Sequence, residues 1–169
     1  MTQGDPSPDW TTDQILHWLE SRGSDRNVAG MARYGIETSK AVGVSNAQLR
    51  PFSRKIKRDH KRALALWDTG VREARLLAGF TAEPKKLTAD DARRWAADFD
   101  SWEIVDHAAD LFVDAGLLGL VGEFAADDRE FVRRAGFAMM AWSAVHLRNE
   151  PDETFLAWMP LIRTHAVDD

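Results

Sequence analysis

Apolar residues recur every three or four positions along most of this chain, the spacing that places side chains on one face of a helix. The clearest stripes run through Ile15 and Leu19, and through Ala92, Trp95 and Phe99. Runs that alternate between apolar and polar residues are too short to indicate a strand. The pattern therefore predicts an all-α protein of about nine or ten helices in antiparallel pairs, arranged as a compact bundle or as an irregular helical-repeat solenoid.

Residues that can cap the first turn of a helix mark where several of these segments begin. Single caps are offered by Thr11 or Thr12, Ser24 and Asp59. Three further starts have the capping-box spacing, in which an acid or amide follows the cap by three positions: Ser45 with Gln48, Thr88 with Asp91, and Asp100 with Glu103. Asp152 caps the last predicted helix, which runs through Ile162.

Length and composition indicate a single globular domain. The chain has 169 residues, of which 44% are hydrophobic, enough for one domain with a real core. We expect residues 1–8 to form a flexible lead-in and residues 9–169 to form the domain itself. With no cysteine, the chain can form neither a disulfide nor a thiolate metal site. Neither a secretory signal nor an apolar run of membrane-spanning length is visible, so we expect a cytoplasmic protein.

Charge is distributed unevenly along the chain. The net charge is −5, yet residues 50–75 hold nine bases against three acids, a net charge of +6. Residues 98–130 hold ten acids against one base, a net charge of −9. A chain polarised in this way can bind a polyanion through its basic segment while the acidic remainder stays in solvent. The plain alternative is that the basic segment is only a solvated helix face.

The segment Asp98–Asp106 holds the most distinctive candidate chemistry. It places Trp102 and Asp106 four residues apart, and so on one face of the predicted helix. A large π surface beside a carboxylate suits a cationic or sugar-like ligand. Helical spacing alone favours the alternative that the Trp belongs to the core and the Asp to the solvent-facing side.

Four groups of residues occur in order along the chain: Ala29–Ile36 with Ala41–Ser45, Leu66–Trp67 with Glu73–Arg75, Trp95 with Asp98–Asp106, and Phe131–Phe137. Together they resemble the AlkD-like DNA alkylation repair glycosylases over roughly residues 24–162. The resemblance implies a right-handed solenoid of HEAT-like antiparallel helical pairs that receives duplex DNA. Family members excise alkylated purines such as N3-methyladenine and N7-methylguanine, without a pocket for a flipped base.

The matched functional positions are Trp102, Asp106 and Arg134. By this resemblance Asp106 stabilises the oxocarbenium-like sugar and positions the attacking water, while Trp102 packs on the deoxyribose. Arg134 holds a backbone phosphate through its guanidinium group. Tyr34 corresponds to an aromatic residue of the binding cleft, although a helix-end aromatic packed on the core is an equal alternative.

Basic residues supply the candidate phosphate contacts: Arg54, Lys55, Lys57, Arg58, Lys61, Arg62 and Arg133. The five histidines lack a ligand spacing such as His-x-x-x-His, so we predict neither a metal site nor any other cofactor. The last predicted helix carries more apolar side chains than one buried stripe needs, and the family uses a further Trp beyond the last residue of this sequence. We therefore expect this helix either to mediate self-association or to leave an apolar patch open to a partner.

Two alternatives to an alkylpurine glycosylase stay open from the sequence. One is a HEAT-like protein that binds DNA without cleaving it, and the presence of Trp102, Asp106 and Arg134 favours the enzyme over it. The other is a protein–protein scaffold, against which the basic segment argues.

Overall fold

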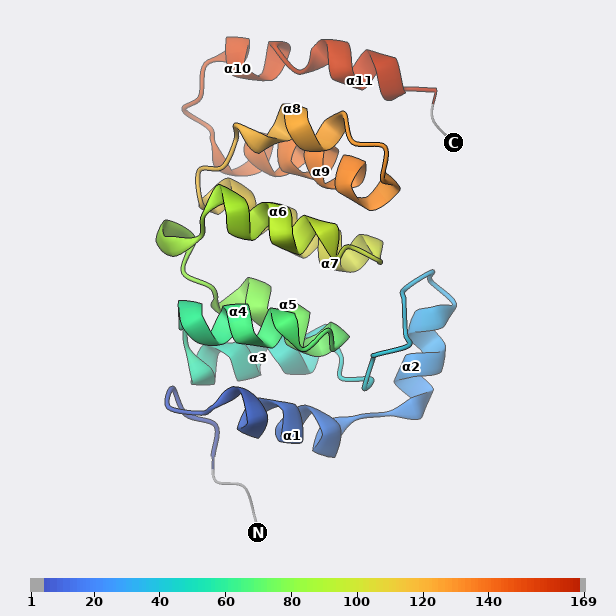
Figure 1. Ribbon diagram of the computed structural model, residues 1–169, viewed down its shortest axis with the longest axis vertical. Helices are drawn as coiled ribbons and strands as arrows, with labels where there is room; N and C mark the ends of the chain where they lie inside the picture. Colours follow the sequence, from blue (N-terminus) through green and yellow to red (C-terminus); the bar gives the residue numbers. More distant parts are fainter. Residues whose placement is uncertain (1–4, 168–169) are drawn as a thin grey trace. The chain divides into compact units, whose positions relative to one another are not determined.

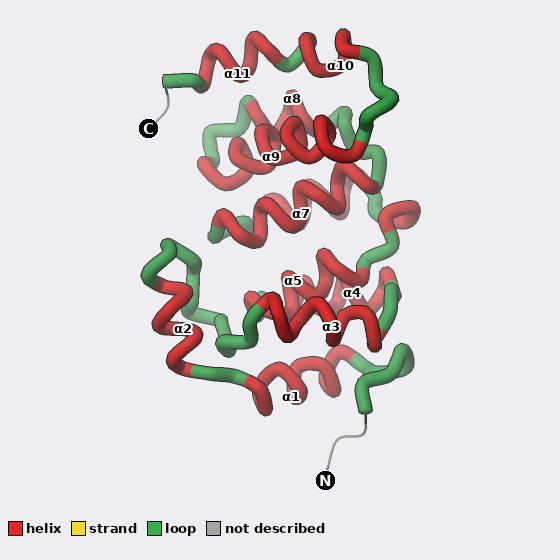
Figure 2. Tube along the Cα trace, turned by 180° about the vertical axis from the view of Figure 1, so that it is seen from behind, coloured by secondary structure: helices red, strands yellow, loops and turns green. Residues whose placement is uncertain are grey.

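The computed structural model describes residues 5–167; the first half of the predicted lead-in, residues 1–4, lies outside the described residues, as do residues 168–169. Within the described residues the chain forms eleven α-helices and one short 3₁₀ helix, with no strand (Figures 1 and 2). The all-α prediction is confirmed. None of these helices has both the length and the apolar character needed to cross a membrane.

The chain divides into two compact units, Met1–Lys86 and Leu87–Asp169. The prediction of a single domain over residues 9–169 stays a prediction. The first unit consists of α1 (Thr12–Arg22), α2 (Asp25–Ala32), α3 (Asn46–Ile56), α4 (His60–Asp68), α5 (Arg72–Thr81) and the 3₁₀ helix η1 (Pro84–Lys86). In its core α5 packs against α4, α3 and α1.

The predicted helix starts of the first unit are confirmed by their hydrogen bonds. Thr11 forms a capping box with Gln14 at the start of α1, and Ser45 forms one with Gln48 at the start of α3. Asp59 accepts a hydrogen bond from the backbone N–H of the third residue of α4. These local bonds satisfy amides that a helix leaves without an internal partner.

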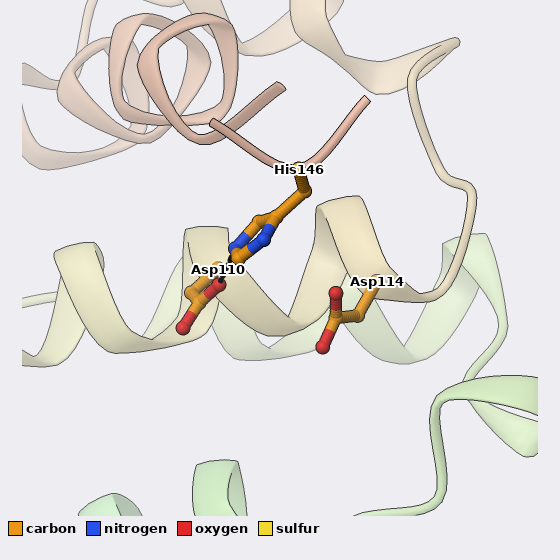
Figure 3. Close-up of side chains that lie close together, drawn as sticks. All are labelled: Asp110, Asp114 and His146. Atoms are coloured by element: carbon orange, nitrogen blue, oxygen red, sulfur yellow. Dashed lines mark hydrogen bonds and ion pairs between the residues drawn. The ribbon is translucent and has the colours of Figure 1, made fainter. Parts of the chain in front are cut away.

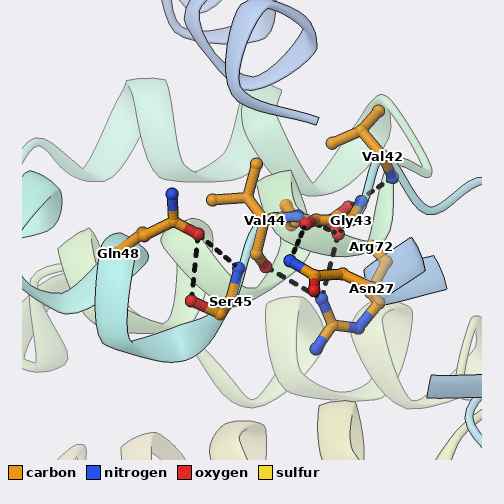
Figure 4. A network of polar contacts seen from close by, with 8 residues as sticks. Asn27, Val42, Gly43, Val44, Ser45, Gln48 and Arg72 are labelled. Atoms are coloured by element: carbon orange, nitrogen blue, oxygen red, sulfur yellow. Dashed lines mark hydrogen bonds and ion pairs between the residues drawn. The ribbon is translucent and has the colours of Figure 1, made fainter. Parts of the chain in front are cut away.

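A buried carboxylate holds the loop that leads into α3. The side chain of Glu73 is 0% exposed and accepts backbone N–H groups from Val42 at 3.0 Å, Gly43 at 2.8 Å and Val44 at 3.2 Å. Figure 4 labels the three loop residues and Arg72. The guanidinium of Arg72, 6% exposed, donates to the same carboxylate at 3.0 Å. Gly43 has a φ of +88°, and a Cβ there would come within 2.2 Å of a backbone oxygen. Close packing at Gly43 and the hydrogen bonds to the carboxylate of Glu73 therefore hold this loop in place.

Arg62 is a second buried arginine, and its role differs from the predicted one. Its guanidinium donates to the backbone oxygens of Pro8 at 2.6 Å, Trp10 at 3.1 Å, Ile56 at 2.7 Å and Lys57 at 2.8 Å. Only 7% of the residue is exposed. Because its donors are directed at carbonyl groups inside the unit, the predicted phosphate contact at Arg62 is wrong.

The second unit consists of α6 (Ala89–Ala97), α7 (Trp102–Asp114), α8 (Leu120–Ala125), α9 (Glu130–His146), α10 (Asp152–Leu156) and α11 (Met159–His165). The long helix α9 packs against α7, α8 and α6. Its Gly136 is required by the close approach of α8, since a Cβ there would lie 2.4 Å from the backbone nitrogen of Ala125. The predicted capping box of Thr88 and Asp91 is present at the start of α6.

The last predicted helix, Asp152–Ile162, is two helices in the structure. α10 ends at Leu156 and α11 begins at Met159, with Pro160 in its first turn. The physical reason is the proline: it has no N–H to donate, and inside a continuous helix its ring would clash with the carbonyl four residues earlier. Within α10 and α11 no residue is buried, and Leu156, Met159 and Ile162 are large exposed apolar side chains.

Candidate active site

The candidate site begins at the amino end of α7. Ser101 is the N-cap residue, so the predicted capping box of Asp100 with Glu103 does not start this helix. Ser101 is 1% exposed and Glu103 is 8% exposed, which places the cap itself in the interior. Trp102 is the first residue of the helix and is 37% exposed. Asp106 follows one turn later, as the spacing predicted.

Arg134 joins Trp102 and Asp106 from the neighbouring helix α9. Its Nε donates to Oδ1 of Asp106 at 3.0 Å, and its terminal nitrogen donates to Oδ2 at 2.8 Å. The guanidinium carbon lies 6.0 Å from the ring centroid of Trp102. The bidentate bonds to Asp106 raise the pKa of Arg134. The three residues that the resemblance identified therefore lie together, although their phosphate and sugar contacts stay predictions.

The carboxylate and the guanidinium of this pair are both open to solvent. The side chain of Arg134 is 46% exposed and that of Asp106 is 34% exposed. A carboxylate at this degree of exposure is accessible to a sugar or a water molecule, and the guanidinium is accessible to a phosphate. The pair therefore presents a negative group and a positive group side by side at the surface.

A recess of about 410 Å³ adjoins this pair, and neither its presence nor its main aromatic residue was predicted. It is lined by Asp106, Arg134, Phe137, Ala138, Ala141 and Trp142. The indole N–H of Trp142 donates to the backbone carbonyl of Asp106 at 3.1 Å, which fixes the ring against α7. The only sequence signal for Trp142 is its spacing of eight residues from Arg134, which is equally typical of a core position.

A second group of polar side chains lies where α7 and α9 end. Asp110 and Asp114 of α7 and His146 of α9 point toward one another (Figure 3), and one potential ligand atom of each lies within 4.8 Å of the others. Nε2 of His146 is 2.7 Å from Oδ1 of Asp110. The imidazole stacks on the ring of Trp142, with centroids 5.4 Å apart and planes at 10°. Histidine spacing alone could not indicate this group, because its members come from two helices.

The predicted phosphate contacts of the first unit are largely at its surface. Arg54 lies on α3, and Lys57, Arg58 and Lys61 lie between α3 and the first turn of α4; all four are exposed, as is Lys55. Tyr34 is 76% exposed, so the alternative that it packs on the core is wrong. The contacts of these side chains with DNA stay predictions.

Arg133, the predicted phosphate contact of the second unit, is half-buried. Its guanidinium donates to the backbone oxygens of Asp127 at 3.0 Å and Asp128 at 3.2 Å. These bonds hold the segment that precedes α9, so part of its hydrogen-bonding capacity serves the fold. The guanidinium group of Arg134, the next residue, supplies the positive charge beside the recess.

Comparison with known proteins identifies a family and a similar fold. The sequence profile of the family described as DNA alkylation repair enzyme matches residues 15–165. A solved structure is similar over 94% of this chain and 77% of its own, with a TM-score of 0.71 and 19% sequence identity. That protein is described as belonging to "a new family of proteins related to the HEAT-like repeat DNA glycosylases with affinity for branched DNA structures". No curated protein matches the sequence. The structural match supports the predicted HEAT-like fold.

Proposed function

This chain belongs to the DNA alkylation repair enzyme family, and from that premise we propose that it hydrolyses the N-glycosidic bond of positively charged alkylated purines in duplex DNA. The substrates are bases such as N3-methyladenine and N7-methylguanine. The observation that carries the proposal is the grouping of Trp102, Asp106 and Arg134 at one exposed place on α7 and α9.

The proposed reaction requires from the protein mainly a negative charge that is held close to the sugar. Alkylation at N3 or N7 places a positive charge on the purine, which weakens the bond to C1′ of the sugar. When that bond breaks, the purine takes the electron pair and becomes neutral, and the sugar becomes oxocarbenium-like. Water then adds at C1′ and loses a proton. The carboxylate of Asp106 stabilises the cationic sugar, and once bound DNA has excluded water from the site such stabilisation is worth several kcal/mol.

Trp102 and Arg134 have supporting roles in this proposal. The ring of Trp102, at the amino end of α7, packs against the deoxyribose and favours its cationic form. Arg134 holds a DNA phosphate in place of its present partner Asp106. Because a phosphate competes for the same two donors, DNA binding releases the carboxylate at the moment that the sugar arrives. The pairing at 2.8 Å and 3.0 Å supports this exchange, since both donors that a phosphate requires are already aligned.

The exposed bases of the first unit serve the same proposal through phosphate contacts. Arg54, Lys57, Arg58 and Lys61 belong to the segment of charge +6. Such contacts hold the backbone of any duplex and carry no information about its sequence. Base removal then depends on the alkylated purine itself, and the proposal requires no pocket for a flipped base.

The direct test is incubation with a duplex that contains a single N7-methylguanine. We expect free N7-methylguanine and an abasic site in equal amounts, and neither from the undamaged duplex. The Asp106→Asn variant serves as the matched control. Release of the base by the wild type and the variant at equal rates would contradict the role of Asp106, and no release by the wild type would contradict the activity.

The second candidate function is DNA binding without base removal. It is favoured by the structurally similar protein, which is described as having affinity for branched DNA. If this chain acts in the same way, it binds a four-way junction more tightly than a linear duplex of equal length, and it releases no base. Titration of both DNAs at the same salt concentration, beside the base-release assay, separates the two functions.

We further propose that the chain self-associates through α10 and α11. The support is the exposed apolar side chains of Leu156, Met159 and Ile162 on two helices that contain no buried residue. A second copy that covers these side chains removes their apolar surface from water.

A further inference from the structure

We propose that Asp110, Asp114 and His146 bind a divalent transition-metal ion of the zinc class. The three side chains come from the carboxyl ends of α7 and α9 (Figure 3). This site is separate from the Trp102–Asp106–Arg134 group and does not depend on the glycosylase reaction. The spacing of the histidines predicted no metal site, because such spacing reveals only ligands that are near one another in the sequence. These three residues come from two helices.

The geometry is close to that of a coordination sphere. Nε2 of His146 and Oδ1 of Asp110 are 2.7 Å apart, and the ligand atoms of all three residues lie within 4.8 Å of one another. Ligands about 2.0–2.2 Å from a zinc ion are separated from each other by roughly 3–4 Å. Binding of an ion replaces the hydrogen bond between His146 and Asp110 and draws in the carboxylate of Asp114, whose side chain is exposed.

The electrostatics of this place favour a cation. Two carboxylates one helical turn apart concentrate negative charge on α7, while the imidazole is neutral when it binds a metal. Asp114 is the last residue of α7 and His146 is the last residue of α9. The carbonyl ends of both helices therefore add their partial negative charges at the same point.

The ligand set indicates which ion fits. Mg²⁺ and Ca²⁺ prefer oxygen ligands throughout, whereas imidazole nitrogen suits zinc and its transition-metal neighbours. Three protein ligands leave at least one coordination position for water, as in open zinc sites. The absence of cysteine from the chain rules out the closed thiolate type.

Trp142 connects this site to the recess beside Asp106. Its ring stacks on His146 at 5.4 Å, and its indole N–H donates to the carbonyl of Asp106 at 3.1 Å. An ion that immobilises the imidazole of His146 also holds this ring. The indole N–H of Trp142 is therefore a local reporter of metal binding.

The experiment is titration of the full, untagged chain with ZnCl₂ by calorimetry, followed by the same titration of Asp114→Asn and His146→Ala. We expect one ion per chain with a dissociation constant in the micromolar range. Each variant should weaken binding by at least about tenfold, the loss typical even of an outer-shell partner. His17→Ala, which removes an exposed histidine of the first unit, is the matched control and should bind as the wild type does.

A second measurement locates the ion. In nitrogen–proton correlation spectra, ZnCl₂ should shift the indole signal of Trp142, which is identified by its loss in Trp142→Phe. The shift should be absent in Asp114→Asn, an exposed substitution that leaves the packing of α7 and α9 intact. Equal affinity in all variants, no binding by the wild type, or an unmoved Trp142 signal would each overturn the proposal.

Discussion

Two arginine–carboxylate pairs, one in each unit, use the same chemistry for different purposes. In the first unit Arg72 and Glu73 are 6% and 0% exposed, and the carboxylate also accepts three backbone N–H groups. In the second unit Arg134 and Asp106 are 46% and 34% exposed, and the two side chains meet through two parallel bonds. The first pair binds backbone groups within its own unit, and the second pair faces solvent beside a recess.

The difference in burial decides what each pair can do. A buried ion pair whose hydrogen bonds are complete cannot exchange partners, and removal of one member leaves the other charged in the interior. An exposed pair contributes little to stability and can be opened by a ligand that offers a better partner. The Arg72–Glu73 pair is therefore a structural anchor, and the Arg134–Asp106 pair is the candidate functional one.

The largest expected effect is on the anchor. Glu73→Gln keeps the shape of the side chain but leaves the buried guanidinium of Arg72 without a counter-charge, so the free energy of unfolding should fall by about 3–5 kcal/mol. Urea denaturation followed by circular dichroism measures it. Asp106→Asn, the matched change in the exposed pair, should cost no more than about 1 kcal/mol. Equal losses of unfolding free energy in the two variants would contradict the view that only the Arg72–Glu73 pair anchors the fold.

The next effect is on catalysis. Asp106→Asn should slow the release of N7-methylguanine by about 2–4 kcal/mol, or roughly 30-fold to 900-fold, because the carboxylate acts in the transition state. DNA affinity should stay unchanged or improve slightly. Single-turnover kinetics and a binding titration measure both quantities. Asp90→Asn, an exposed aspartate on α6, is the control and should react at the wild-type rate.

A smaller and less specific effect is expected in the first unit. Reversal of Lys57, Arg58 and Lys61 to Glu should weaken binding to any duplex and lower the log–log salt slope by up to about three units, since each phosphate contact contributes about 0.9. Reversal of Lys85 and Lys86, which lie outside the basic segment, should leave the slope unchanged. An identical slope in both variants would make the basic segment a solvated face.

The smallest effect concerns association. Leu156→Glu with Ile162→Glu should abolish concentration-dependent assembly without changing the base-release rate, because neither exposed side chain lines the recess beside Asp106. Light scattering across a concentration series follows the mass, with Val167→Glu as an exposed control. A wild-type chain that stays monomeric throughout the series would remove self-association from the proposal.

The sequence by itself determined the features that depend on near neighbours. The capping boxes at Ser45 and Thr88 and the cap at Asp59 were predicted correctly because each joins groups three residues apart. The same holds for the single turn between Trp102 and Asp106. The break before Pro160 is equally local, but the apolar stripe continues across it, so periodicity alone predicts a single helix there.

Only the tertiary structure decided how distant side chains are used. Arg62 has the same charge as Lys61, yet it is turned inward to four carbonyl groups, because the segments around Pro8 and Lys57 approach it. Nothing in their spacing assigns Asp106 to Arg134 or Asp110 to His146, which are paired by the packing of α7 against α9. Burial and partner choice depend on which surfaces meet, and that is set by the packing of whole helices.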